Sequence, residues 1–251
     1  MNILVVGGTG LIGRQVVTLL TEAGHTAEAA SPSTGVNSIT NEGVDAAMAG
    51  RDAVIDLTNA MIFEEDVVVD FFTTSTRNLL AAEVRAGVRH HVALSIVGSD
   101  RLPAAGYMAG KVAQEREIRA GEVPFTIVRA TQFYEFLGGI ADAGTVDGVV
   151  RVTDKLMQPM ASSEVARAVA NAALETPAVG RVLEIAGPAS GSMVSFVAQA
   201  LAARGDLRSV VADADAGYFG IPLEEDSLIP VGEATLGTVT LAAWLAESER
   251  G

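Results

Sequence analysis

The stretch NILVVGGTGLIGRQVVTLLTEAG, residues 2–24, determines the fold that we expect for this chain. It starts with a short apolar run rich in β-branched residues, which is typical of a buried parallel strand. Glycines follow at Gly7, Gly10 and Gly13, and the residues after them predict an amphipathic helix that stops at Gly24. A strand, a G-x-x-G-x-x-G turn and a helix in this order are typical of a dinucleotide-binding unit.

Each glycine of this turn has its own expected task. Gly7 permits the tight turn, Gly10 lets a pyrophosphate approach the backbone, and Gly13 lets the helix pack closely on the strand. The first amides of the helix then face the phosphates, and the helix dipole favours their negative charge. No G-K-[ST] follows, so an ATP-type P-loop is not supported. The predicted cofactor-binding residues of this turn are Gly7, Thr9, Gly10, Leu11, Ile12 and Gly13.

Strands and helices are predicted to alternate along most of the chain. Further strands are expected at 25–30, 52–58, 90–98, 124–130 and 180–187, and further helices at 71–87, 109–121, 162–176, 195–205 and 241–248. The helix over 162–176 is expected to be capped by Ser162 or Ser163. This alternation implies right-handed crossovers and an α/β fold, a Rossmann-type doubly wound parallel sheet with helices on both faces.

The expected organisation is a single Rossmann-type domain over residues 1–251. After residue 130 the pattern loosens, and residues 131–160 and 210–251 are predicted to contribute a small substrate-binding lobe. That lobe would lie over the carboxyl edge of the sheet, where ligands bind in folds of this kind.

Composition argues against several classes of protein. The formal charge of −14 comes from scattered carboxylates that would repel a phosphate backbone, so no nucleic-acid partner is expected. The chain has no cysteine, and its three histidines show no metal-ligand spacing, so no metal site is predicted. No apolar run is long enough for a membrane span, and the N-terminus predicts a strand rather than a signal peptide. We therefore expect a cytoplasmic protein that acts on a small molecule, with its oligomeric state open.

The residues around the end of the second predicted strand, EAASPSTG at 28–35, bear on the choice of cofactor. An acid at this place would bind the ribose 2′-hydroxyl of NAD, whereas a base would hold the 2′-phosphate of NADP. Ser31 occupies the tip and is predicted to contact the cofactor, and no Arg or Lys occurs between Arg14 and Arg51. NAD(H) is therefore favoured, and NADP(H) is possible with Arg14 as the nearest cation.

A second motif, GYMAGK at 106–111, places Tyr107 and Lys111 four residues apart on one face of a predicted helix. A lysine close to a phenol lowers the pKa of the phenol, which can then exchange a proton near neutral pH. Ser95 ends the preceding strand, where its hydroxyl would polarise the same substrate oxygen. Alternatively, Tyr107 and Lys111 lie on a solvated helix face. Asn78, on the preceding helix, either completes a polar relay to this pair or is an exposed helix residue. We predict that Ser95, Tyr107 and Lys111 are catalytic.

Several motifs together resemble one family over nearly the whole chain. GGTGLIG (7–13), LSIVG (94–98) and YMAGK (107–111) are similar to an atypical short-chain dehydrogenase/reductase. The chain also resembles the NmrA-like, NAD(P)H-binding branch of that family at four stretches: TIVRATQFYEF (126–136), QPM (158–160), SSEVARAVA (162–170) and LEIAGP (183–188).

This resemblance implies roles for individual residues. Tyr107 would be the proton donor, Lys111 its tuner and the anchor of the nicotinamide ribose, and Ser95 the partner of the substrate oxygen. Thr58 and Asn59 follow a strand and would line the adenosine side of the cofactor. Relatives commonly carry an arginine where this chain reads ASPS (30–33), and this departure puts an NADP preference in doubt.

The stretch ATQFYEFLGG, residues 130–139, follows a sheet strand and would bring an amide and aromatic faces near the nicotinamide. Met157 would close this pocket from the lobe. The alternative for these side chains is ordinary core packing. A flat, apolar carbonyl compound, such as a quinone or an aromatic polyketide, would suit the pocket. The predicted substrate-binding residues are Ser95, Tyr107, Gln132, Phe133, Phe136 and Met157.

Three functions are compatible with these motifs. The first is an NAD(P)(H)-dependent oxidoreductase that acts on a carbonyl of a small, aromatic or quinone-like molecule, with Tyr107 as proton donor. The second is a quinone-tailoring, monooxygenase-type enzyme of aromatic polyketide biosynthesis, in which the reduced product reacts with oxygen. The third is an NmrA-like dinucleotide-sensing regulatory protein. The resemblance implies that some sensors of this kind have lost the tyrosine, so the presence of Tyr107 counts against the third hypothesis.

Overall fold

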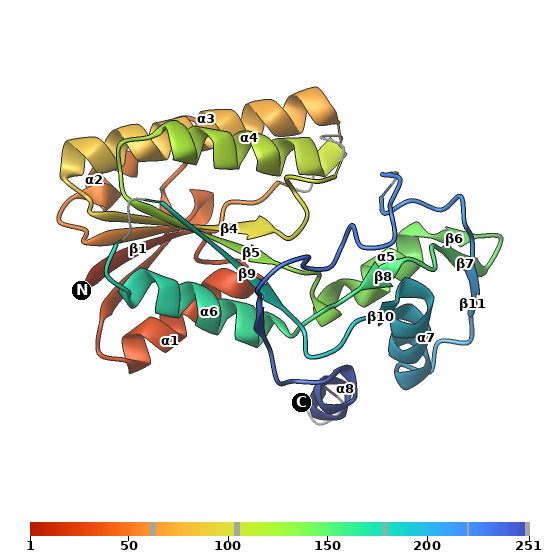
Figure 1. Ribbon diagram of the computed structural model, residues 1–251. Coiled ribbons are helices and arrows are strands. Elements are labelled where there is room, and N and C mark those ends of the chain that lie inside the picture. The colour runs from red at the N-terminus through yellow and green to blue at the C-terminus, as the bar shows by residue number, and fades with distance from the viewer. Residues whose placement is uncertain (61–63, 103–105, 178–179, 220, 249–251) are drawn as a thin grey trace.

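The computed structural model in Figure 1 describes residues 1–60, 64–102, 106–177, 180–219 and 221–248. The strands of its central sheet are β1 (Asn2–Val6), β2 (Thr26–Ala30), β3 (Ala53–Asp56), β4 (His90–Ile96), β5 (Phe125–Ala130), β9 (Arg181–Ala186) and β12 (Thr235–Leu236). These seven strands lie in the order β12-β9-β5-β4-β3-β1-β2, and each neighbouring pair is parallel. The predicted Rossmann-type, doubly wound parallel sheet is confirmed.

The order of the strands reverses next to β1. From β1 the chain crosses to β2 on one side, and it then returns to β3 on the other side. In an open parallel sheet such a reversal leaves a crevice outside the carboxyl ends of the strands, and ligands bind in this crevice. The fold therefore directs attention to the residues that follow Val6 and Asp56.

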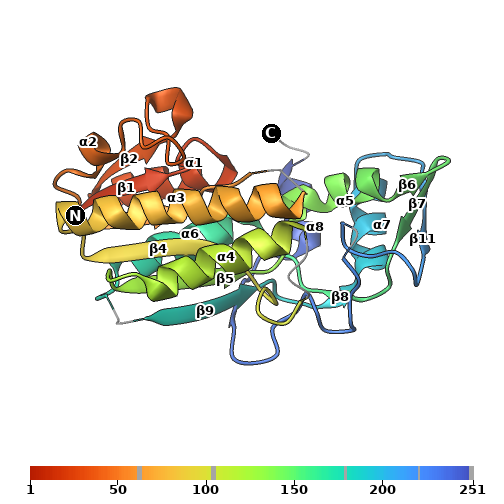
Figure 2. The same cartoon turned by 90° about the horizontal axis from the view of Figure 1, so that it is seen from above.

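Helices cover both faces of the sheet. They are α1 (Leu11–Glu22), α2 (Val44–Met48), α3 (Glu65–Ala86), α4 (Gly106–Ala120) and α6 (Ser162–Leu174). Figures 1 and 2 show α3 and α4 side by side over one face, with α2 beside α3, whereas α1 and α6 lie together over the opposite face. The sheet is thus the middle of three layers.

The burial of β1 follows from this layering. Ile3 and Val5 pack into the core beneath α1 and α6, and Leu4 and Val6 pack into the core beneath α3. Side chains of a strand alternate between its two faces, so a strand that is covered on both faces needs apolar residues at consecutive positions. The apolar run that opens the sequence has this pattern.

A smaller part of the molecule lies beyond the carboxyl ends of β5 and β9, and we call it the lobe (Figures 1 and 2). It consists of α5 (Leu137–Ala143), β6 (Thr145–Val146), β7 (Val149–Val152), β8 (Leu156–Met157), β10 (Gly191–Ser192), α7 (Met193–Ala203) and β11 (Ser209–Ala212). β11, β7 and β6 form one sheet, and β10 pairs with β8 in another. The lobe therefore also contains β10 and α7, which lie outside the two segments expected from the sequence.

Some predicted element boundaries need correction. α3 begins at Glu65, six residues before the expected start, and its acidic first turn favours a helix N-terminus there. α6 is not capped by its own serines, because its N-cap is Ala161. The carboxylate of Glu135 instead accepts hydrogen bonds from the Ser162 amide (3.2 Å) and hydroxyl (2.6 Å). Glu135 lies in the one-turn helix η2 (Tyr134–Phe136), so the segment after β5 holds the start of α6.

The last described element is α8 (Leu241–Ser248), the predicted closing helix. Over the described ranges, no helix combines the length and apolarity needed to cross a membrane. The same residues contain no group of three or more potential metal ligands that could hold an ion.

Candidate active site

The glycine turn has a backbone that other residues could not adopt. Gly7 has a φ of +78°, and a Cβ atom there would lie 2.5 Å from the carbonyl oxygen of Leu57. A Cβ on Gly13 would lie 2.5 Å from Gly8 Cα and still closer to the Gly7 carbonyl oxygen. A Cβ on Gly10 would meet only the Gly7 carbonyl oxygen, at 3.3 Å. The geometry therefore fits a tight turn at Gly7, close packing at Gly13 and an open approach at Gly10.

The start of α1 offers amides to an anion. Its N-cap is Gly10, which has no side chain to cap the helix, and the first turn contains no acidic residue. Leu11 is 46% exposed, whereas Ile12 is buried in the core, so Ile12 can serve a ligand only through its backbone. Uncapped N–H groups and the helix dipole together form a site for phosphate oxygens. These residues fit the pyrophosphate of a dinucleotide.

The tip of β2 is closed by its own hydrogen bonds. Ser31 is buried, and its hydroxyl lies 2.8 Å from the Ser33 hydroxyl in the short helix η1 (Pro32–Thr34). The two nearest arginines in the sequence are engaged: Arg51 forms an ion pair with Glu28, and Arg14 Nε donates to the Thr9 carbonyl oxygen at 2.6 Å. Thr9 thus fixes Arg14 through its backbone.

The residues after β3 connect the crevice to α4. Thr58 donates its amide proton to Asp56 Oδ1 at 2.9 Å, and its own hydroxyl oxygen is buried without a partner in the structure. Asn59 Oδ1 accepts a hydrogen bond from the Tyr107 hydroxyl at 2.7 Å. The structure therefore places Asn59 beside the predicted proton donor, whereas the resemblance implied the adenosine side.

Tyr107 and Lys111 occupy successive turns of α4 and share one neighbour. The Tyr107 ring packs edge-on against Phe72 with 5.9 Å between centroids, and Lys111 Nζ stands 4.7 Å from the centre of the same ring. Lys111 is 4% exposed, and its Nζ donates to the Leu94 carbonyl oxygen at 2.7 Å. A solvated helix face is therefore the wrong interpretation for Lys111.

The electrostatics of this pair differ from the prediction. Burial raises the pKa of Tyr107 above its ordinary value. Burial also lowers the pKa of Lys111 to about 8, and the carboxylates of Asp56 and Glu115 partly oppose that effect. Desolvation disfavours a charged group and here outweighs any lowering of the phenol's pKa by the lysine. In this structure the phenol therefore holds its proton at neutral pH.

Gln114 links Lys111 to the crevice and was missed by the sequence analysis. It is fully buried, its Oε1 accepts a hydrogen bond from Lys111 Nζ, and its Nε2 donates to Asp56 Oδ2 at 2.8 Å. A continuous set of contacts thus runs from Lys111 through Gln114 and Asp56 to the amide of Thr58. The signal was available, because residues three apart on a helix share a face.

Ser95 takes part in a different cluster. Its hydroxyl donates to Glu115 Oε1 at 2.7 Å, and Arg129 donates to both oxygens of the same carboxylate, at 2.9 and 2.7 Å. Glu115 follows Tyr107 by eight residues, which is about 12 Å along a helix axis. The structure therefore does not bring Ser95 to Tyr107, since the serine faces a turn of α4 two turns further on.

The segment after β5 supplies part of the expected pocket. Gln132 is buried, and neither atom of its amide group has a hydrogen-bond partner in the structure. Phe133 and Phe136 stack with 5.3 Å between ring centroids, and Phe136 is 44% exposed. Met157 is completely buried in the core of the lobe, so core packing is the correct interpretation for this residue.

Asn78 is neither a relay residue for Tyr107 and Lys111 nor an exposed helix residue, the two roles considered from the sequence. Its Nδ2 donates to the carbonyl oxygens of Ser38 (2.7 Å) and Ile39 (3.2 Å). These bonds fasten α3 to the loop that follows β2, so the role of Asn78 is structural.

Fold and glycine turn together define a Rossmann-type dinucleotide-binding protein. A model of the NAD(P)H-binding family matches residues 7–177, and the chain therefore belongs to that family. This confirms NAD(P)H as the predicted cofactor.

Curated relatives agree with this assignment. One is the (4-alkanoyl-5-oxo-2,5-dihydrofuran-3-yl)methyl phosphate reductase of Streptomyces griseus, which is 29% identical over 203 residues and covers 74% of this chain. The chain spans 68% of that protein, and it spans 47% and 54% of the lengths of two further curated relatives. One of these two is also a reductase by name, in line with the predicted class of enzyme.

Solved structures share the fold over the whole chain. A short-chain dehydrogenase/reductase superfamily protein from Agrobacterium tumefaciens with bound NAD has a TM-score of 0.75 at 18% identity, covering 100% of this chain and 96% of its own. An NADPH-dependent quinone oxidoreductase from Escherichia coli has a TM-score of 0.68 at 17% identity, covering 98% and 99%. These structures confirm the Rossmann-type fold that the resemblance to short-chain dehydrogenases/reductases implied.

Proposed function

We propose that the protein is an NAD(P)H-dependent reductase of a small conjugated carbonyl compound of the quinone type, with Tyr107 as the proton donor. One observation carries this proposal: a phenol and a buried ammonium lie on successive turns of α4, and the phenol is hydrogen-bonded to Asn59 at the end of β3. β3 borders the crevice that the uncapped start of α1 also faces.

Reduced nicotinamide, when bound, supplies a hydride to the substrate carbon. Tyr107 supplies the matching proton to the substrate oxygen, and its raised pKa keeps that proton on the phenol until the oxygen becomes basic. The ammonium of Lys111 stabilises the phenolate that remains. Asn59 holds the hydroxyl in place, because its Oδ1 accepts a hydrogen bond from that hydroxyl in the resting state.

NADH is the proposed cofactor in preference to NADPH. The tip of β2 carries Ser31, whose hydroxyl already contacts Ser33, and Arg51 is neutralised by Glu28. A 2′-phosphate needs a cation at this position. Arg14 is held by the Thr9 carbonyl oxygen, so its guanidinium would have to exchange one hydrogen bond to serve NADPH.

The quinone-type substrate is proposed from the side chains after β5. The unpartnered amide of Gln132 provides both a donor and an acceptor, and the Phe133–Phe136 stack provides a flat apolar surface. A planar carbonyl compound offers matching features. The similarity in fold to a quinone oxidoreductase supports this choice.

The test is the variant Tyr107→Phe, assayed for oxidation of NADH by 1,4-naphthoquinone. We expect kcat to fall about 100-fold or more, because the general acid is lost, while the Kd for NADH stays within about twofold. Ser95→Ala is the matched control and is expected to keep kcat within about threefold. Unchanged turnover in Tyr107→Phe would refute the proton-donor role.

An oxygen electrode in the same assay separates simple reduction from the monooxygenase-type alternative. Reduction alone consumes one NADH for each hydroquinone formed and no oxygen under conditions where the free hydroquinone is stable. Oxygen uptake that requires the protein, NADH and quinone together would favour the alternative. A sensor would instead bind NADH and NAD⁺ with clearly different affinities and turn over neither, since only differential affinity shifts a conformational equilibrium.

A further inference from the structure

A second tyrosine, Tyr218, follows β11 of the lobe and forms an isolated antiparallel bridge with Ile221. Tyr218 and Ile221 exchange two backbone hydrogen bonds, with N–O distances of 2.8 and 3.1 Å. Phe219 has a φ of +49°, which is rare for a residue other than glycine, and a Cβ on Gly217 would lie 2.5 Å from the Ile221 carbonyl oxygen. Strained backbone of this kind persists only where its surroundings fix it, and it concentrates at ligand sites.

Tyr218 and Phe219 form one wall of a cavity in the lobe. The Tyr218 and Phe219 rings meet edge to face with 4.8 Å between centroids, and both line a cavity of about 260 Å³. Ile140 of α5, Val152 of β7 and Met193 of α7 provide apolar parts of the remaining lining, and Arg151 and Asp213 provide charged side chains. The cavity is therefore lined by both apolar and polar groups, with a phenol at one side.

Tyr218 packs against the core of the lobe, which includes Met108 of α4, the residue that follows Tyr107. Burial raises the pKa of Tyr218, and the charge of the Tyr107 phenol raises it further. Across the described ranges, the Tyr218 hydroxyl makes no hydrogen bond. A phenol that is largely buried ordinarily has a partner, which leaves this donor available to a ligand.

We propose that Tyr218 is a substrate-binding residue that donates a hydrogen bond to a second oxygen of the molecule whose first oxygen receives the proton of Tyr107. This inference rests on the proposed function and makes it more specific. The preferred substrates would be dicarbonyl compounds such as 1,4-quinones. Their ring substituents would occupy the cavity beside Phe219.

Binding to the NAD⁺-loaded protein tests the inference without turnover. Isothermal titration calorimetry compares 1,4-naphthoquinone with 1-tetralone, a bicyclic ketone that has a single carbonyl oxygen. The chain has no cysteine for the quinone to alkylate. Tyr218→Phe is expected to weaken binding of 1,4-naphthoquinone about tenfold, as the loss of one buried hydrogen bond implies. Its affinity for 1-tetralone should change less than about twofold.

The matched control is Tyr134→Phe. Tyr134 is a buried tyrosine of the same region, but its hydroxyl already donates to the Val239 carbonyl oxygen at 3.1 Å. This variant should leave the ratio of the two affinities unchanged. Equal weakening of both ligands by Tyr218→Phe, no weakening at all, or failure of the wild type to bind 1,4-naphthoquinone would each overturn the inference.

The two proposals fail in different ways. If Tyr107→Phe keeps full turnover while Tyr218→Phe changes the affinity ratio, the catalytic role falls and the binding role stands. If Tyr107→Phe loses turnover while the ratio is unaffected by Tyr218→Phe, only the role of Tyr218 is refuted.

Discussion

The central sheet and the lobe differ in what holds their residues in place. Sheet strands such as β1 and β4 are buried on both faces, and the turn after β1 is fixed by glycine backbones that touch each other. In the lobe, β6, β8 and β10 are two residues long, and single side chains define the cavity. The part that fits the cofactor is thus specified by the backbone, whereas the part proposed to choose the substrate can vary residue by residue without changing the fold.

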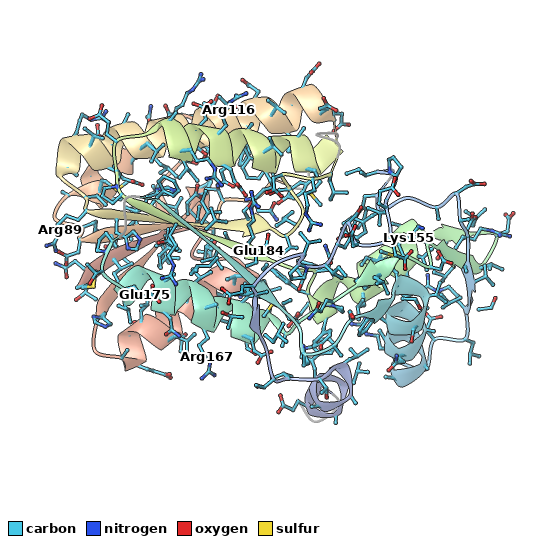
Figure 3. The ribbon with its side chains drawn as sticks, viewed as in Figure 1. Arg89, Arg116, Lys155, Arg167, Glu175 and Glu184 are labelled. Carbon is cyan, nitrogen blue, oxygen red and sulfur yellow. The ribbon has the colours of Figure 1, made fainter. Side chains whose placement is uncertain are left out.

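The largest expected effect comes from breaking an ion pair inside the sheet part. Glu83 of α3 and His91 of β4 are both fully buried, with 2.8 Å between Oε1 and Nδ1. Glu83→Ala is expected to lower the free energy of unfolding by about 4 kcal/mol, because it leaves the buried imidazole of His91 without its carboxylate partner. In the lobe, Lys155 and Glu225 form an exposed pair at 3.3 Å (Figure 3 labels Lys155), and Glu225→Ala should cost less than about 1 kcal/mol. Denaturant unfolding of both variants measures the contrast.

The same pair predicts how stability depends on pH. Burial alone would lower the pKa of His91, but the charge and hydrogen bond of Glu83 and the charge of Asp56 raise it above 6.5. A raised pKa stabilises the fold fully below about pH 6.5, and that contribution is lost as the pH rises through the pKa of the folded state. Glu83→Gln should remove this dependence of the free energy of unfolding on pH, and His25→Gln should keep it. If the dependence survives in Glu83→Gln, the pair of Glu83 and His91 is not its cause.

A smaller effect is expected from matched glycine substitutions. Gly13→Ala would push a methyl group into the backbone of Gly7 and Gly8, at a cost of about 3 kcal/mol, and should weaken NADH binding. A Cβ on Gly139, in α5 of the lobe, would meet nothing within 4 Å, so Gly139→Ala should be neutral or stabilising by about 0.5–1 kcal/mol. Equal destabilisation by the two changes would erase the contrast between the sheet and the lobe.

The smallest expected effect concerns Gln114. Gln114→Leu removes the hydrogen bonds that hold Lys111 and Asp56, and we expect kcat/KM to fall about tenfold, or 1.4 kcal/mol. Activity should decline above about pH 8 as Lys111 loses its charge. Gln114→Glu places a carboxylate beside Lys111 and should move this decline to higher pH.

The control for Gln114 is Arg116→Gln. Arg116 lies on the outer side of α4 and pairs with Glu117 (Figure 3). The variant Arg116→Gln should change neither the rate nor the pH profile of the rate. If Gln114→Leu lowers stability but leaves the pH profile in place, the contact with Lys111 has no positioning role.

The sheet part could be predicted from the sequence because its rules are local. β1 coincides with the predicted strand, and Gly7 and Gly13 have the backbone constraints that their spacing implied. The Tyr107–Lys111 pair was found for the same reason, since four residues form one turn of a helix. What the pattern missed here was burial, which reverses the expected shift in the pKa of Tyr107.

The remaining site depends on contacts between residues far apart in the sequence. Ser95 lies at the expected end of its strand, but spacing cannot show which turn of α4 it faces, and it faces Glu115. Met157 resembles a pocket residue in sequence and is core in the structure. Tyr218 follows Tyr107 by 111 residues in a segment without periodicity, so no local signal could have identified it.

The cap of α6 has a consequence for how the two halves of the proposed site can move relative to each other. Ser162 donates its hydroxyl to Glu135 and accepts a hydrogen bond from Gln15 Nε2 at 3.0 Å. Gln15 belongs to α1, whose first turn fits the pyrophosphate, and Glu135 belongs to the segment that carries Gln132. One serine thus joins the cofactor helix to the substrate loop. A shift of either segment would strain these hydrogen bonds, so the proposed cofactor and substrate regions are mechanically linked.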